Sequence, residues 1–278
     1  MTWNADQVYA PPKTFGMRRR LRSILLRRDL AYRLFLKRKC GAMRPIGRPD
    51  APWENAVLQG RDEWEQAIVQ ALGLGLPLHN EPAKNWDSLA ALDSILRRTN
   101  TTAAILDAGA EFYSVILPWL FLYGYRNLRG INLGFSSPIQ LGPIRYERGD
   151  ITRTGFKENT FDAVTCLSVI EHGVDLDRYF KEVARILKPE GVVITSTDYF
   201  ETPIDTQGKE AFGAPIRIFR RDEINDALQV ASSHGLALTG PLDLSCGEKT
   251  VHWKQYQLDY TFLAFTLKKG MRPGSEAR

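Results

Sequence analysis

The spacing of hydrophobic residues changes near residue 101 and divides the chain into two parts. Before this point apolar residues recur every three or four positions, which is typical of amphipathic helices. The ranges that we predict as helices here are 17–39, 61–72 and 87–98. After it, short continuous apolar runs alternate with helical stretches, and the first run is Ala103–Leu106. Runs of this kind indicate buried strands of a parallel sheet.

The second part is predicted as strands alternating with helices. Strands are expected over 103–106, 128–133, 144–147, 161–167, 192–197, 236–239 and 260–266, and helices over 112–125, 176–187 and 221–234. Pro118 must lie in the first turn of its helix or kink it, and Asp175 is well placed as an N-cap. Residues 188–191 should end the helix that Asp175 begins. This alternation predicts a doubly wound α/β fold, in which helices cover both faces of a mainly parallel sheet.

Composition and charge suggest a division into four segments. We expect a basic extension, helical or partly disordered, over 1–50; a linker and accessory helices over 51–100; the catalytic domain over 101–270; and a disordered tail over 271–278. The first fifty residues contain 13 Lys and Arg against 3 Asp and Glu, a net charge of +10. Since the whole chain carries +5, the remainder carries −5.

The basic extension is open to three interpretations. It can pack on the catalytic domain with its charges in water, make peripheral contact with an anionic membrane, or bind nucleic acid. The acidic remainder disfavours nucleic acid as a partner. Oligomeric state is not predicted by any feature of the sequence.

A cytoplasmic location is expected, with the inner face of the membrane as the alternative. The three cysteines include no Cys-x-x-Cys pair, and the N-terminus lacks the pattern of a signal peptide. The longest apolar run, 115–125, is shorter than the roughly 20 residues that span a bilayer. No metal site is expected, because the histidines and cysteines lack metal-ligand spacing.

Four short blocks occur in a fixed order at or next to the predicted strands. They are Leu106–Glu111, Gly149–Ile151, Phe161–His172 and Leu187–Ile194. In this order and spacing the blocks resemble those of the class I S-adenosylmethionine-dependent methyltransferases, in particular the methyltransferase type 11 group, over residues 101–268. The resemblance implies S-adenosyl-L-methionine as the cofactor. It also implies a Rossmann-like sheet of seven strands whose last strand is antiparallel.

The resemblance assigns cofactor-binding roles to a set of residues at the ends of the strands. These are Asp107, Ala108, Gly109, Asn132, Asp150, Ile151 and Ser168. A residue without a β-carbon at Gly109 lets the backbone approach the methionine part of the cofactor. Asp150 would accept a hydrogen bond from the adenine amino group, and Asn132 stands where the family has an acidic residue that binds the ribose hydroxyls. Residues 167–170 would line the methyl-transfer site. The alternative is that Asp107 and Asp150 only cap turns.

His172 is the candidate catalytic base. Methyl transfer from an activated sulfonium needs mainly proximity and orientation, together with a base when the acceptor is a hydroxyl. The alternative is that the pair Glu171-His172 only shapes the entrance of the next helix. Asp198 and Tyr199 are lesser candidates for orienting the substrate. Cys166 lies inside a predicted buried strand and is interpreted as a core residue.

Two departures from the family pattern affect the cofactor turn. Glu111 and Tyr113 replace later glycines, and Asn132 replaces the acidic residue. Glu111 would repel the pyrophosphate of a nicotinamide dinucleotide, which makes an oxidoreductase a distant alternative. The expected reaction is O-methylation of a sugar or other small hydroxylated acceptor, such as a glycan or lipid-linked intermediate, with 200–219 and 245–258 shaping its pocket. An RNA methyltransferase and a non-catalytic methyltransferase-like binding protein remain as alternatives.

Overall fold

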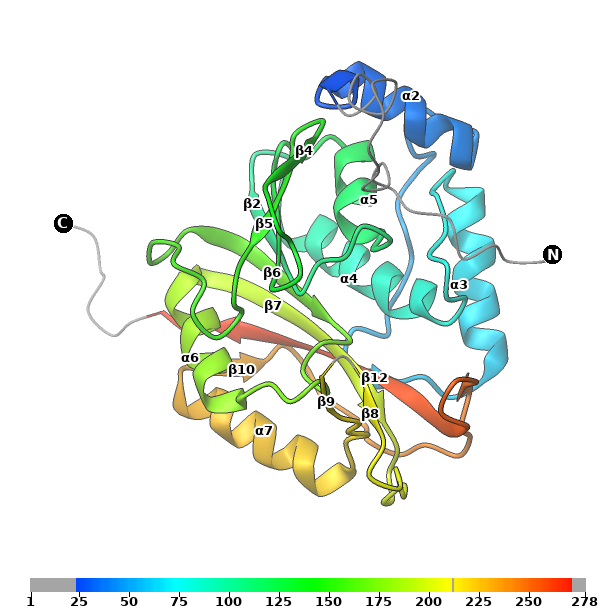
Figure 1. Cartoon of the computed structure of the whole chain (residues 1–278), viewed down its shortest axis with the longest axis vertical. Helices are drawn as coiled ribbons and strands as arrows, with labels where there is room; N and C mark the ends of the chain where they lie inside the picture. The colour runs from blue at the N-terminus through cyan, green and yellow to red at the C-terminus, as the bar shows by residue number, and fades with distance from the viewer. Residues whose placement is uncertain (1–23, 212, 272–278) are drawn as a thin grey trace.

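The computed structural model describes residues 24–211 and 213–271, and its centre is a large twisted sheet (Figure 1). Along this sheet the strands run in the order β5-β3-β2-β6-β7-β12-β10. Their bounds are β2 (Ala104–Ala108), β3 (Asn127–Asn132), β5 (Ile144–Arg148), β6 (Phe161–Leu167), β7 (Leu187–Tyr199), β10 (Leu236–Leu238) and β12 (Leu258–Lys269). β12 is antiparallel to β7 and to β10, whereas β5, β3, β2, β6 and β7 pair in parallel. The predicted fold class is therefore confirmed.

Short strands extend this sheet at its edges. β1 (Ala56–Val57) and β11 (Val251–Trp253) pair with β12, and β4 (Ile139–Leu141) forms a hairpin with β5. β8 (Glu210–Ala211) and β9 (Ala214–Pro215) make a separate two-stranded ribbon. β1 comes from the range expected as a linker, so this part of the chain contributes a strand to the sheet.

Helices cover both faces of the sheet (Figure 1). Their bounds are α2 (Asp29–Cys40), α3 (Arg61–Gly73), α4 (Lys84–Arg98), α5 (Ile116–Leu122), α6 (Leu176–Ile186) and α7 (Arg221–Ser233). Alternate residues of each strand enter two different cores: Ile105 faces the core made with α4 and α5, and Leu106 faces the core made with α6 and α7. This alternation follows from the two-residue period of a strand.

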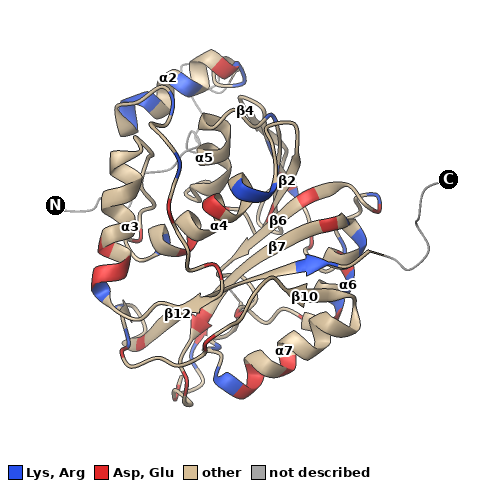
Figure 2. Ribbon diagram, turned by 180° about the vertical axis from the view of Figure 1, so that it is seen from behind, with Lys and Arg blue, Asp and Glu red and all other residues tan. Residues whose placement is uncertain are grey.

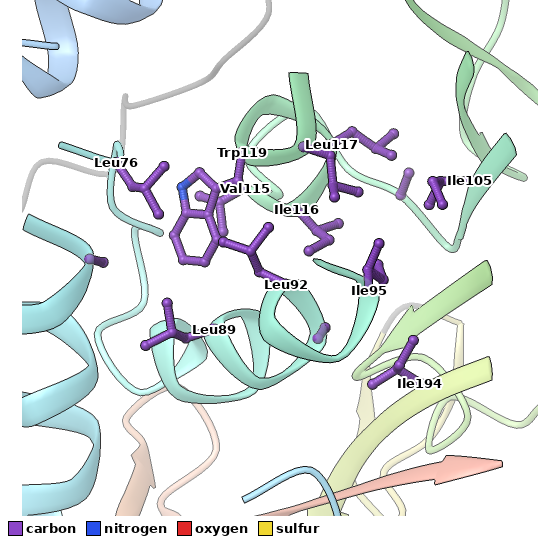
Figure 3. Close-up of a cluster of buried hydrophobic side chains, with 14 of the residues drawn as sticks. Leu76, Leu89, Leu92, Ile95, Ile105, Val115, Ile116, Leu117, Trp119 and Ile194 are labelled. Atoms are coloured by element: carbon purple, nitrogen blue, oxygen red, sulfur yellow. The ribbon is translucent and has the colours of Figure 1, made fainter. Parts of the chain in front are cut away.

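α4 is enclosed along almost its whole length, from Asn85 to Leu96. Its residues Leu89, Leu92 and Ile95 point toward α5, with Ile105 and Ile194 of the sheet nearby (Figure 3). Trp119 of α5 fills the space beside Leu92, and its indole nitrogen donates a hydrogen bond to the carbonyl of Pro77, at 2.7 Å. The helix starts three residues before the predicted Asp87, and this difference matters for the candidate site.

The helix predicted over 17–39 is interrupted in its described part: residues 24–25 and 29–39 are helical, and residues 26–28 are not. Residues 1–23 lie outside the described residues, and the chain turns at residues 26–28 before α2 starts at Asp29. The carbonyl of Leu26 accepts a hydrogen bond from the backbone N–H of Gly142, at 2.8 Å. A continuous helix would use that carbonyl for residue 30. Leu26 is buried.

Two further local predictions have clear outcomes. Asp175 is confirmed as the N-cap of α6, because its carboxylate accepts a hydrogen bond from the backbone N–H of Arg178, at 3.1 Å. The helix predicted over 112–125 is shorter at both ends, and Pro118 is the third residue of α5, inside the first turn. Phe112 lies outside α5, and its ring packs on Phe135, with ring centroids 4.7 Å apart.

None of the helices in the described ranges combines the length and the apolar character that crossing a membrane requires.

Replacing Leu92 with alanine should lower the free energy of unfolding by about 2–5 kcal/mol, because the cavity left between α4 and α5 cannot collapse onto the sheet. Leu30→Ala is the matched control. It removes the same atoms from a side chain of α2 that is 64% exposed, and should change stability by less than about 0.5 kcal/mol. Urea unfolding followed by circular dichroism measures both. Equal effects of the two substitutions would contradict the described packing of α4.

Candidate active site

The turn after β2 is fastened to the end of β3. The backbone N–H groups of Gly109 and Ala110 both donate to the carbonyl of Ile131, at 2.9 and 3.0 Å. The side-chain amide of Asn132 donates to the carbonyl of Gly109, at 3.4 Å, and the N–H of Gly149 donates to the carbonyl of Asn132, at 3.3 Å. The carboxyl ends of three parallel strands therefore meet, as the strand-end blocks predicted, and they bring most of the predicted cofactor-binding residues to one edge of the sheet.

Gly109 cannot be replaced without disturbing this meeting point. Its φ angle is +92°, a conformation that favours glycine. A β-carbon at this position would lie 2.4 Å from a methyl group of Val169, which follows β6. The glycine therefore allows the segment after β6, including Ser168, to approach the turn after β2.

Asp107 is a buried carboxyl group at the end of β2, with 4% of its surface exposed. The hydroxyl of Thr165 donates a hydrogen bond to its Oδ1, at 2.8 Å. Burial raises the pKa of Asp107 to about 7, and the nearby charge of Glu111 acts in the same direction. The neighbouring Ala108 and the more distant Ile151 belong to the apolar core beneath α6 and α7.

Asp150 lies exposed after β5 and closes a tight turn. Its Oδ1 accepts hydrogen bonds from the backbone N–H and the hydroxyl of Thr152, at 2.8 and 2.7 Å. This is the turn-capping role that the sequence left open as an alternative. Contact of Asp150 with an adenine amino group stays a prediction.

Asn132 and Glu111 form a hydrogen-bonded pair that the sequence did not reveal. The amide nitrogen of Asn132 donates to Oε1 of Glu111, at 3.1 Å, and its amide oxygen accepts from the backbone N–H of Gly134, at 2.7 Å. A carboxylate is thus present at the end of β3, although the neighbouring turn supplies it. One signal in the sequence could have revealed the pair. Glu111 and Asn132 both depart from the family pattern, and they follow or end neighbouring strands.

Ser168 offers a hydroxyl group for a ligand. Its φ angle is +52°, and its backbone N–H donates to the carbonyl and the hydroxyl of Ser196, at 3.0 and 3.1 Å. The Oγ of Ser168 itself is buried and has no hydrogen-bond partner among the described residues. A buried hydroxyl without a partner is costly, so this group fits a site where a bound molecule completes its hydrogen bonding.

A second group of polar residues lies buried where β6 and β7 end. It consists of the buried Asp87, Glu171, Asp198 and Tyr260 and the partly exposed Lys84. The hydroxyl of Ser196 donates to Asp87, at 2.6 Å, and the hydroxyl of Thr197 donates to Oε2 of Glu171, at 3.0 Å. Tyr260 is hydrogen-bonded to Asp198, and the ammonium of Lys84 lies 3.8 Å from the ring centre of Phe262. We refer to these five residues as the buried polar cluster.

The electrostatics of the buried polar cluster are set by three carboxyl groups around one lysine. Burial raises the pKa of Glu171 to about 7 and holds the pKa of Asp198 well above its usual range. Burial alone would lower the pKa of Lys84, but Asp87, Asp198 and Glu171 outweigh it and raise that pKa. Lys84 is therefore a permanent positive charge at neutral pH. Oε1 of Glu171 has no hydrogen-bond partner among the described residues.

His172 lies half-buried in the turn after β6. Its backbone N–H donates to the carbonyl of Val169, at 3.1 Å. Burial and the charge of Lys84 lower the pKa of His172 to about 4. The imidazole is therefore uncharged at neutral pH, as a proton acceptor must be.

The sequence assigned no site role to Lys84 and Asp87, which come from the first turn of α4. Their partners are far away in the chain, and Asp87 and Ser196 are 109 positions apart. The signal for a site on α4 was the presence of the polar residues Asp87 and Ser94 on a helix whose residues are buried on every side. Within residues 24–211 and 213–271, no group of three His, Cys, Asp or Glu side chains is placed to hold a metal ion.

Comparison with known proteins finds similarity in the central part of the chain. Residues 131–195 match the family model of the methyltransferase domain. A stretch of 49 residues is 39% identical to sterol 24-C-methyltransferase of Aspergillus fumigatus. This match covers 18% of the chain and 13% of that enzyme, so the chain spans only a small part of its curated relative.

Solved structures of similar shape are distant in sequence. An S-adenosylmethionine-dependent methyltransferase from Methanosarcina mazei is 15% identical over 64% of this chain and 98% of its own, with a TM-score of 0.49. The 1,6-didemethyltoxoflavin-N1-methyltransferase of Burkholderia thailandensis is 16% identical over 82% of this chain and 94% of its own, with a TM-score of 0.48.

Replacing Gly109 with alanine should weaken binding of S-adenosylmethionine at least about tenfold, because the added methyl group pushes Val169 and Ser168 away from the turn. Gly235→Ala is the control, since Gly235 also has a positive φ, +80°, but an added β-carbon would meet no atom within 4 Å. Isothermal titration calorimetry measures both affinities. Equal affinities of the two variants would show that the contact with Val169 does not shape the site.

The raised pKa of Asp107 predicts a pH-dependent stability. The folded protein keeps the proton to about pH 7, whereas the unfolded chain releases it near the ordinary value of 3.8. The stability that Asp107 contributes is therefore fully present below pH 3.8 and is lost as pH rises through about 7. Relative to wild type, Asp107→Asn should gain on the order of 2 kcal/mol of stability between pH 5 and pH 8. Urea melts at the two pH values test this, and an unchanged difference would contradict the burial of a titrating carboxyl.

Proposed function

We propose that this chain, which contains a class I S-adenosylmethionine-dependent methyltransferase domain, transfers the methyl group to a hydroxyl of a small acceptor such as a sugar or a lipid-linked glycan intermediate. The observation that carries the proposal is the uncharged, half-buried imidazole of His172 beside the end of β6. A hydroxyl must lose its proton when it attacks a methyl group, and a neutral imidazole can accept that proton.

The residues around the turn after β2 fit the cofactor. When bound, S-adenosylmethionine supplies a methyl group that is already activated by its sulfonium charge. The turn at Gly109, the pair of Asn132 and Glu111, and the hydroxyl of Ser168 would hold it. These groups suit a cationic ligand that carries hydroxyls, because a carboxylate accepts hydrogen bonds from hydroxyls strongly. Glu111 would repel the pyrophosphate of a dinucleotide, so the same groups argue against an oxidoreductase.

The buried polar cluster sets the protonation state of His172 in two steps. The positive charge of Lys84 keeps the imidazole free of a proton before the reaction. Asp87 is the strongest of the carboxyl groups that raise the pKa of Lys84, and it keeps the ammonium charged against the effect of burial. His172 is more accessible than Glu171, which is 1% exposed, and it is therefore the group that can reach an acceptor.

Replacing His172 with alanine should reduce turnover by about 10²–10⁴-fold, the usual contribution of a general base, and leave the affinity for S-adenosylmethionine within about twofold. The assay follows S-adenosylhomocysteine release and transfer of labelled methyl groups to a panel of nucleotide sugars and simple phenols, with total RNA as a separate acceptor. His234→Ala is the matched control, because His234 lies at the end of α7 and pairs with Asp177.

Near-normal turnover of His172→Ala would refute the role of His172, and label in RNA alone would refute the acceptor class. The pH profile separates His172 from Glu171. Because His172 titrates near pH 4, kcat/KM should stay level from about pH 5.5 to 8. A rise through pH 7 would instead assign the base to Glu171, whose pKa is about 7.

A further inference from the structure

Exposed apolar side chains gather on one part of the molecule. The described residues include nine large hydrophobic side chains that are exposed, and seven of them belong to α2, its flanking segments and α3. The seven are Ile24, Leu25, Leu30, Leu34, Ile46, Val69 and Leu72. The other two, Leu133 and Met271, lie elsewhere in the chain. Single exposed apolar residues are normal, but such a grouping marks an interaction surface.

The segments that carry these residues adjoin one another. The backbone N–H of Ile46 donates to the carbonyl of Leu74, just after α3, at 3.0 Å. A β-carbon on Gly75 would lie 2.6 Å from the β-carbon of Ala42, just after α2. Figure 1 shows α2 across the end of α3, at the top of the molecule. We call residues 24–48 together with residues 69–73 the apolar-basic surface.

α2 is held so that one of its sides stays outward. Tyr32 and Leu36 are fully buried in the core. The guanidinium of Arg33 donates to the carbonyls of Met43, Phe121 and Leu122, at 2.8 to 3.2 Å. Leu30 and Leu34 are 64% and 47% exposed and lie four residues apart, so they share a stripe of the helix that the core does not cover.

The same surface is strongly basic. Its exposed cations are Arg27, Arg28, Lys37, Arg38, Lys39, Arg44 and Arg48. The only acidic residue among residues 24–48 is Asp29, and it is paired with Arg126. Figure 2 shows the blue segments of α2 beside long tan stretches. The preceding sequence, residues 17–22, adds four arginines.

We propose that the apolar-basic surface binds the face of an anionic lipid bilayer. The cations would lie among the anionic head groups, and the leucines of α2 would enter the boundary between head groups and acyl chains. Apolar side chains next to Lys and Arg are what such a boundary requires. A phosphate backbone of a nucleic acid would use the cations alone and would leave the exposed leucines in water.

Sedimentation of the full chain with vesicles tests the proposal. Vesicles of phosphatidylcholine with about one third phosphatidylglycerol should carry the protein into the pellet, and high salt should reduce this binding. Vesicles of phosphatidylcholine alone should bind at least about tenfold less. The double variant Leu30→Ser/Leu34→Ser should lose at least about tenfold in partitioning to the anionic vesicles. Lys37→Gln/Arg38→Gln should lose binding mainly at low salt.

Met271→Ser is the matched control, because it removes an exposed apolar side chain outside the surface and should leave vesicle binding unchanged. Thermal melts without lipid show whether each variant is folded. Equal binding of the leucine variant and wild type, or no binding to anionic vesicles, would overturn the proposal. Binding of an RNA oligonucleotide that depends on Lys37 and Arg38 but not on the leucines would assign the surface to nucleic acid instead. Concentration-dependent dimers that the leucine variant abolishes would assign it to a second copy.

Discussion

The ammonium of Lys84 lies buried between α4 and the ends of β6 and β7, and its charge must be balanced where it lies. Removing an unpaired ammonium from water costs several kcal/mol, which few folds can sustain. Asp87 makes the largest contribution to this balance, and Asp198 and Glu171 raise the pKa of the lysine further. The same charge lowers the pKa of His172 to about 4. One ion therefore connects the position of α4 to the protonation state of the candidate base.

This connection makes the segment before residue 101 part of the site. α4 provides Leu89, Leu92 and Ile95 to the core and, one turn earlier, provides Lys84 and Asp87 to the buried polar cluster. Packing of these apolar side chains therefore fixes the position of α4 along its axis, and with it the position of Lys84 and Asp87 relative to the sheet. A shift of α4 along its axis would separate Lys84 from its carboxyl partners, so that stability of the core and electrostatics of the site depend on the same contacts.

Local patterns predicted the fold well, and long-range pairing limited what the sequence revealed of the site. Apolar runs identified the strands, and Asp175 capped α6 where the sequence placed it. Periodicity alone placed residues 26–28 in a helix, because it carries no information that the carbonyl of Leu26 bonds to Gly142. The buried polar cluster was missed for the same reason: a buried acid looks like any other helical polar residue until its distant partner is known. The residues at the strand ends lie together because parallel strands bring their ends together, which is a property of topology. Their contact with a cofactor stays a prediction.

Glu111 and Asn132 show why departures from a family pattern have to be considered together. An aspartate at position 132 would lie within hydrogen-bond distance of the Glu111 carboxylate, and like charges this close repel each other. An asparagine avoids the repulsion and uses both ends of its amide: the oxygen accepts from Gly134, and the nitrogen orients Glu111. The carboxylate at the end of β3 is therefore present but reaches its place from the turn after β2. The two departures from the family pattern therefore compensate each other. The carboxylate that is missing at position 132 is supplied by Glu111, and the amide of Asn132 binds it.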